Sequence, residues 1–112
     1  MAVNYELSMV RGDTFSFDVN FSEFEDKTID GLFFTVKRKE FDKEHVIQKS
    51  LEDGITTEAE YSYRVRVAPG DTRTVIPGSY VYDLQVCIGD DVYTILKGVF
   101  SIQPDVTRGG ET

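Results

Sequence analysis

The chain has 112 residues, of which 40% are hydrophobic and 29% are charged, a balance typical of one globular domain rather than of a disordered segment. Its formal net charge of -8 argues against unaided nucleic-acid binding, which depends on clusters of lysine and arginine, and it disfavours docking on anionic membranes. The hydrophobic residues never run for the roughly 20 positions of a membrane span, so we expect neither a nucleic acid nor a membrane as a partner.

Strand patterns dominate the chain in sequence order. The predicted strands cover residues 4–10, 14–21, 32–38, 46–51, 61–67, 77–88 and 92–102. Apolar and polar residues alternate in most of them, which indicates strands with one buried and one exposed face. Gly98, inside the last pattern, predicts a β-bulge at that position. Residues 103–112 look like a flexible C-terminal tail.

Short strands separated by regular turn signals, with no amphipathic helix, predict the fold class. We expect an all-β domain over residues 1–102, an immunoglobulin-like β-sandwich of about seven antiparallel strands. A small β-barrel is the alternative. The stretch "PGSYVYDLQV" fits a tyrosine corner, in which Tyr80 or Tyr82 bonds backbone a few residues upstream.

No residue pattern in the chain indicates catalysis or a cofactor. His45 is the only histidine and lies in a charged segment, so an exposed loop position is favoured over a base or a metal ligand. Cys87 has no neighbouring histidine or basic residue to activate it, and as the only cysteine it forms no disulfide within the chain. We therefore expect no catalytic residue, no metal and no cofactor. The tripeptide Arg11–Asp13 ("RGD") suggests adhesion, but its place between two strand patterns favours an ordinary turn.

The outward side chains of the third, sixth and seventh predicted strands form a candidate interface. These strands are neighbours in an immunoglobulin-like order, and their outward residues are more apolar than a fully solvated face would be. Such patches usually mark contacts with other chains, including self-association. The candidate interface residues are Phe33, Thr35, Val81, Gln85, Tyr93, Ile95 and Val99. High β-propensity on an ordinary surface is the competing interpretation.

Five segments follow one another along the chain in a characteristic order: "RGDTFSFDVNF", "LFFTVKRKEFD", "VIQKSL", "VAPGDTRTVIPGSYVYDLQV" and "YTILKGVFSIQPDVTR". In this order the chain resembles small immunoglobulin-like β-sandwich proteins of Gram-positive phages and prophages, similar to the N-terminal domain of phage baseplate upper proteins. The resemblance implies a structural or assembly protein of a tail or baseplate, present in the bacterial cytoplasm during assembly and in the virion. The chain stops about ten residues after the last predicted strand, which favours an assembly or accessory role over host adsorption. The rival hypothesis is a small carbohydrate- or ligand-binding module, which a pocket of aromatic and carboxylate side chains would favour.

Overall fold

The computed structural model describes residues 3–24 and 26–106, and almost all regular structure in them is β-strand. The strands are β1 (Val3–Asn4), β2 (Leu7–Val10), β3 (Phe15–Asn20), β4 (Gly31–Lys37), β5 (Ile47–Leu51), β6 (Gly54–Ala59), β7 (Ser62–Val67), β8 (Gly78–Ile88) and β9 (Asp91–Gln103). Two single helical turns, η1 (Ser22–Phe24) and α1 (Pro69–Thr72), lie in the connections.

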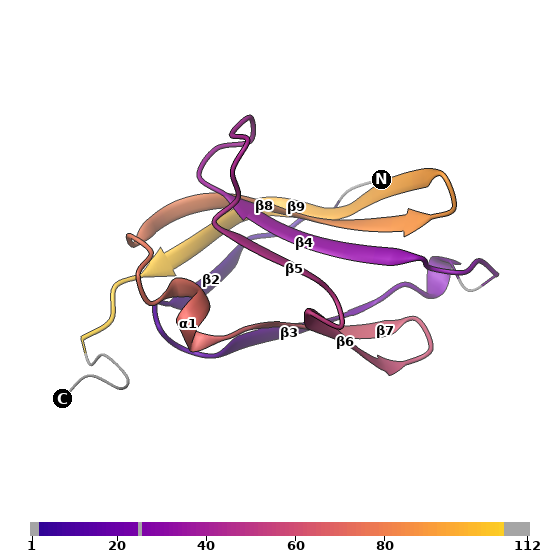
Figure 1. Cartoon of the computed structure of the whole chain (residues 1–112), viewed down its shortest axis with the longest axis horizontal. Coiled ribbons are helices and arrows are strands. Elements are labelled where there is room, and N and C mark those ends of the chain that lie inside the picture. Colours follow the sequence, from indigo (N-terminus) through magenta and orange to yellow (C-terminus); the bar gives the residue numbers. More distant parts are fainter. Residues whose placement is uncertain (1–2, 25, 107–112) are drawn as a thin grey trace.

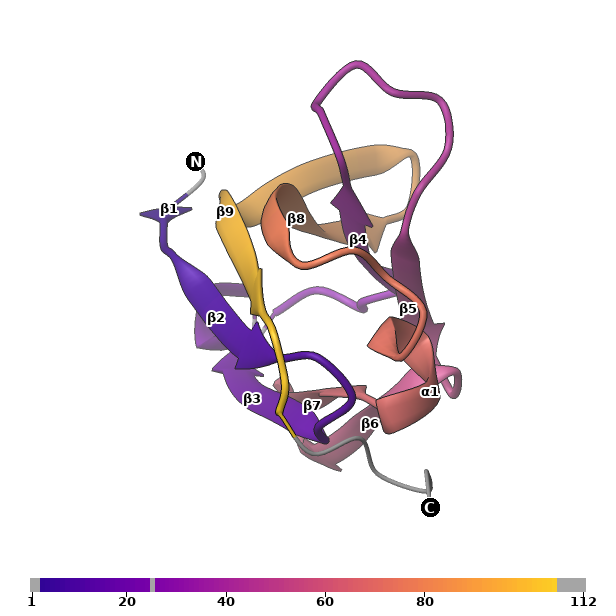
Figure 2. The same ribbon diagram turned by 90° about the vertical axis from the view of Figure 1, so that its left-hand side faces the viewer.

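The strands form one strongly curled sheet in the order β1-β9-β8-β4-β5-β6-β7-β3, with β2 also paired to β9. The curl produces two facing layers, with β8, β9 and β4 in one and β3, β7 and β6 in the other (Figure 1). Viewed from the end, the ribbon curls round on itself, and β2 lies on the side where the two layers do not join (Figure 2). The buried side chains form a single core cluster inside this curl. The two ends of the strand order are therefore β1–β2 and β3.

The core is built from the inward side chains that the alternation predicts. Phe34 and Phe100 are completely buried, with ring centroids 6.0 Å apart. Phe17 packs edge-on against Phe34 at 5.4 Å, and Phe15 packs edge-on against Phe100 at 5.8 Å. This edge-to-face geometry is the one that aromatic quadrupoles favour, so the four phenylalanines join the two layers.

The strand count and directions differ from the prediction of seven antiparallel strands. The predicted first strand is split into β1 and β2, and both pair with β9 in parallel. The sequence prediction missed β6, because Ile55 is its only buried side chain and gives almost no periodic signal. β6 follows a tight corner in which Glu52 has a φ of 66°, and a short parallel pairing with β5 continues the sheet from one layer into the other.

The predicted bulge lies at a different place in β9. Tyr82 pairs with Gly98 in regular register, and the register shift falls between Leu84 and Gln85, which face Leu96 and Thr94. Ile95 is therefore the extra residue. Gly98 has another role, because a Cβ added there would lie 2.5 Å from the carbonyl oxygen of Tyr5. The glycine lets the N-terminal segment cross β9 at close range.

The predicted tyrosine corner is present and uses Tyr80. The Tyr80 hydroxyl donates a hydrogen bond to the carbonyl of Ile76, four residues upstream. Tyr82 reaches the other way, and its hydroxyl donates to the carbonyl of Tyr5 at 2.5 Å. Burial raises the pKa of Tyr82 to about 12, so this phenol stays a donor over the physiological range. The two tyrosines tie β8 to the N-terminal segment and to the connection after α1.

The RGD tripeptide is part of the framework between β2 and β3. Arg11 forms an ion pair with Asp105, with 2.8 Å between Nε and Oδ1, and both side chains are largely buried. Gly12 has a φ of 83° and donates its backbone N–H to the hydroxyl of the fully buried Thr72 at 2.8 Å. The Asp13 N–H closes a turn onto Val10. These contacts support the turn interpretation over an exposed adhesion motif.

The predicted flexible tail begins too early at residue 103. Gln103 pairs with Val10 as the last residue of β9, and Asp105 is held by Arg11. Residues 107–112 of the predicted tail lie outside the described residues.

Candidate functional site

Three neighbouring strands, β4, β8 and β9, present one outward surface, which we call the outer face. Directly opposed residues of paired strands point to the same side, so the register defines this surface. β8 lies at its centre, and the outer face consists of Phe33, Thr35, Lys37, Val81, Asp83, Gln85, Thr94, Lys97 and Val99. The strand adjacency predicted from the sequence is confirmed.

Five of the seven predicted interface residues lie on the outer face, and two do not. Tyr93 pairs with the buried Val86 and packs against Phe24 with ring centroids 5.4 Å apart, which places it on the core side. Ile95 is the bulged residue and packs against the core cluster. Because of this extra residue, the side chains before it in β9 point to the opposite face from the one that simple alternation predicts. The sequence pattern contains no sign of the inserted residue. The remaining five are Phe33, Thr35, Val81, Gln85 and Val99.

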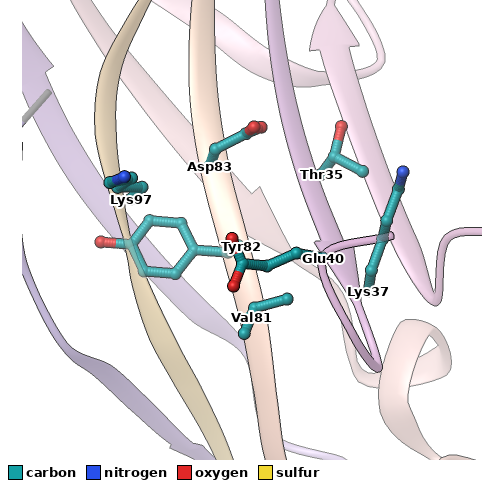
Figure 3. Close-up of a pocket in the computed structure, with 7 residues that line it drawn as sticks. All are labelled: Thr35, Lys37, Glu40, Val81, Tyr82, Asp83 and Lys97. Atoms are coloured by element: carbon teal, nitrogen blue, oxygen red, sulfur yellow. The ribbon is translucent and has the colours of Figure 1, made fainter. Parts of the chain in front are cut away.

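The middle of the outer face is charged rather than apolar. Asp83 lies directly opposite Thr35 on one side and Lys97 on the other. Burial raises the pKa of the Asp83 carboxyl, and the charge of Lys37 opposes this shift. Lys37, Asp83 and Lys97 line a shallow cavity of about 190 Å³ together with Glu40, which projects over the face from the loop after β4 (Figure 3). Apolar residues flank this cluster, and Phe33 and Val99 are each 39% exposed.

A second surface lies where the two ends of the curled sheet face each other, and we call it the seam. It is a groove of about 550 Å³ between the N-terminal strands with β9 on one side and β3 on the other. Its lining consists of Val3, Tyr5, Leu7, Phe15, Phe17, Asp18, Val19, Asn20, Phe21, Glu23, Ile95 and Leu96. Most of these side chains are apolar. The sequence could not reveal the seam, because it joins segments nearly 80 residues apart.

The seam runs along the free edge of β3. Within the described residues β3 pairs only with β7, in an unbroken register from Phe15 to Asn20. The groove is lined by the consecutive residues 17–21. A cavity beneath one face of a strand would meet alternate residues only, because successive side chains point to opposite faces. The groove therefore borders the backbone edge of β3.

The rim of the seam is acidic. Asp18 accepts a hydrogen bond from Nε of Arg64 at 2.8 Å, and this bond lowers the pKa of the carboxyl. Glu58 lies 3.7 Å from the same guanidinium. Glu23 is exposed and has no ion pair with any residue in the described ranges. Because Arg64 is already shared by two carboxylates, Glu23 is the acidic group that remains for an incoming cation.

His45 and Cys87, the candidate chemical groups in the sequence, lie in different parts of the fold. His45 is exposed in the loop between β4 and β5, and Cys87 is partly buried on β8. Residues 3–24 and 26–106 contain no cluster of three histidine, cysteine, aspartate or glutamate side chains suited to hold a metal ion. In the same residues no helix is both long and apolar enough to cross a membrane.

Comparisons with known proteins give a likeness of fold. No protein-family model matches the chain, and neither does any curated protein. Among solved structures, an endo-beta-1,4-mannanase from Thermotoga petrophila aligns over 89% of this chain with a TM-score of 0.56 and 10% identity, and this chain spans only 18% of the mannanase chain. The extracellular domains of the voltage-gated sodium channel beta4 subunit align over 92% of this chain and 93% of that chain, with 11% identity and a TM-score of 0.43. At such identities the first likeness shows a shared β-fold alone.

Proposed function

We propose that this chain is a non-enzymatic, immunoglobulin-like β-sandwich module that binds a protein partner through its outer face. One observation carries the proposal. The outer face combines exposed apolar side chains with charges of both signs at its centre, where Asp83 is flanked by Lys37 and Lys97. An ordinary solvated face of an acidic protein would instead carry scattered polar residues with an excess of carboxylates.

The charge arrangement indicates what a partner would have to supply. Covering a carboxylate without a partner leaves a desolvated charge, which is strongly unfavourable. Desolvation of Asp83 already outweighs the attraction of Lys37, so we expect a partner that covers this face to bring a cation or a hydrogen-bond donor to this carboxylate. Phe33 and Val99 then supply apolar contact around the charged centre. A stable contact would bury roughly 1,000 Å² or more in total.

The setting of this contact is proposed from the sequence resemblance alone. We propose a role in phage or prophage particle assembly, with the protein in the bacterial cytoplasm during assembly and then in the virion. The partner is another particle protein or a second copy of this chain. The solved structures that resemble this fold do not bear on the setting.

The proposal is tested by following the tagged protein in its source strain after prophage induction. We expect the wild-type chain to migrate with particles in a density gradient. Val99→Lys places a charge on the apolar part of the outer face and should reduce the co-migrating fraction about 10-fold or more. Thr57→Lys adds the same charge at an exposed position on β6 and is the matched control. If the soluble wild-type protein does not migrate with particles, the assembly role is wrong. If both variants lose co-migration equally, the outer face is not the contact surface.

A second candidate function is a small carbohydrate- or ligand-binding module. The observation that favours it is the seam, which combines aromatic residues such as Tyr5 and Phe17 with the carboxylates of Asp18 and Glu23. Titration with soluble mannan oligosaccharides, monitored by tyrosine fluorescence, tests the carbohydrate form. A saturable change that Tyr5→Ala removes would favour this candidate over the outer-face contact.

A further inference from the structure

We propose that the seam is a strand-addition site, in which an extended segment of a partner protein pairs with the free edge of β3. The segment would carry apolar side chains at alternate positions and a lysine or arginine at one end. This site is separate from the outer face and does not depend on the contact proposed there.

The backbone of β3 offers the hydrogen bonds for such a segment. The Phe21 N–H donates to the carbonyl of Tyr61 at 2.7 Å, and this pair continues the β3–β7 register by one residue. In antiparallel pairing the residues that bond the partner alternate. The odd-numbered residues of β3 therefore bond β7, and the N–H and C=O groups of Ser16, Asp18 and Asn20 point to the open edge.

This edge lacks the features that usually prevent pairing with another strand. Proteins protect edges with proline, bulges, inward charges or very short strands. β3 has six residues without proline, and its register with β7 has no shift. Its only charged side chain, Asp18, is already paired with Arg64. An unprotected edge beside an apolar groove is the arrangement used in β-strand addition.

The lining of the seam defines the side chains of the incoming strand. The exposed apolar surface includes Val3 and Tyr5, which are each 58% exposed, and the partly buried Ile95. Since strand side chains alternate, every second residue of the segment would point into this groove. Glu23 at the rim has no ion pair within the described ranges, and the chain as a whole carries a net charge of -8. A basic residue at one end of the segment complements this charge.

The test uses a displayed library of random peptides of about 12 residues, selected against the full chain. A selected peptide is then synthesised, and its affinity is measured by fluorescence anisotropy for the wild type, Asp18→Pro and Asp18→Ala. Both variants lose the carboxylate, but only proline removes the N–H that points to the open edge. Because that N–H makes no bond to β7, proline is tolerated there as on other edge strands.

We expect alternating apolar peptides with a terminal lysine or arginine, and binding to Asp18→Pro about 10-fold or more weaker than binding to Asp18→Ala. In the wild type, amide hydrogen exchange of Ser16, Asp18 and Asn20 should slow when the peptide is bound, while the odd-numbered amides of β3 change little. This measurement decides the matter even if Asp18→Pro fails to fold. Val99→Lys should bind the peptide normally, which separates this site from the proposed outer-face function.

Three results would overturn strand addition. The first is a selection that enriches no peptide on the wild type. The second is a bound peptide that leaves exchange at Asp18 and Asn20 unchanged. The third is tight binding of a small apolar compound or peptide that Ile95→Lys abolishes, although Asp18→Pro and Asp18→Ala bind it equally well. That result would mean that the seam binds through side-chain contacts and not through the backbone edge of β3.

Discussion

Gly98→Ala should strongly destabilise the fold, although it adds only one methyl group. The new Cβ would lie 2.5 Å from the Tyr5 carbonyl oxygen and 3.0 Å from Oδ1 of Asn4. The first of these atoms belongs to the backbone, so it moves only if the N-terminal segment moves with it. The Tyr5 N–H bond to the Lys97 carbonyl, 2.9 Å long, would be lost or lengthened. The Tyr82 hydroxyl would lose its acceptor.

The expected magnitude follows from these two hydrogen bonds. Tyr82 is only 4% exposed, and a buried hydroxyl without a partner costs about 1–3 kcal/mol. The backbone bond from Tyr5 contributes about 0.5–1.5 kcal/mol. The sum is a loss of about 1.5–4.5 kcal/mol in the free energy of unfolding. In a domain of this size this corresponds to a fall in Tm of about 6–20 °C.

Urea unfolding followed by circular dichroism measures this loss. Gly70→Ala is the matched control, because an added Cβ there meets no atom within 4 Å, and it should be neutral or slightly stabilising. Tyr82→Phe combined with Gly98→Ala should be clearly less destabilising than the sum of the single changes, since both act on the Tyr5 carbonyl. A Gly98→Ala stability within about 0.5 kcal/mol of the wild type would refute the reasoning.

The other predictions concern one buried hydroxyl and one carboxylate. Thr72→Val keeps the side-chain shape but removes the acceptor of the Gly12 N–H, so it should lower the free energy of unfolding by about 1–3 kcal/mol in urea titration; an unchanged midpoint would contradict a role for this bond. Burial raises the folded-state pKa of Asp83, so the folded state favours the protonated carboxyl. The contribution of Asp83 to the free energy of unfolding is therefore most favourable below the unfolded pKa of 3.8, and it is lost as the pH rises through the folded-state pKa. Asp83→Asn should therefore melt at a higher temperature than the wild type at pH 7, and the difference should shrink toward pH 4; a difference that does not change with pH would point to another cause.

Prediction from the sequence succeeded where local alternation coincided with burial. The inward residues of β4 and β8, such as Phe34 and Leu84, are completely buried as the period of two predicts. The corner tyrosine was limited to two candidates, and Tyr80 is the one that bonds Ile76. Prediction failed at β6, whose alternation is too weak to detect, and at Tyr93 and Ile95, where one extra residue changes the face without any mark in the sequence.

The sequence by itself determined the class of the fold, the positions of most strands and which side of each strand is buried, because these depend on residues two positions apart. The tertiary structure decided the parallel pairing of β1 and β2 with β9, the burial of Arg11 against Asp105 and the bulge at Ile95. It also decided that the two ends of the sheet face each other across the apolar seam. These features join segments far apart in the chain, and their energies depend on packing between layers, which no local pattern encodes.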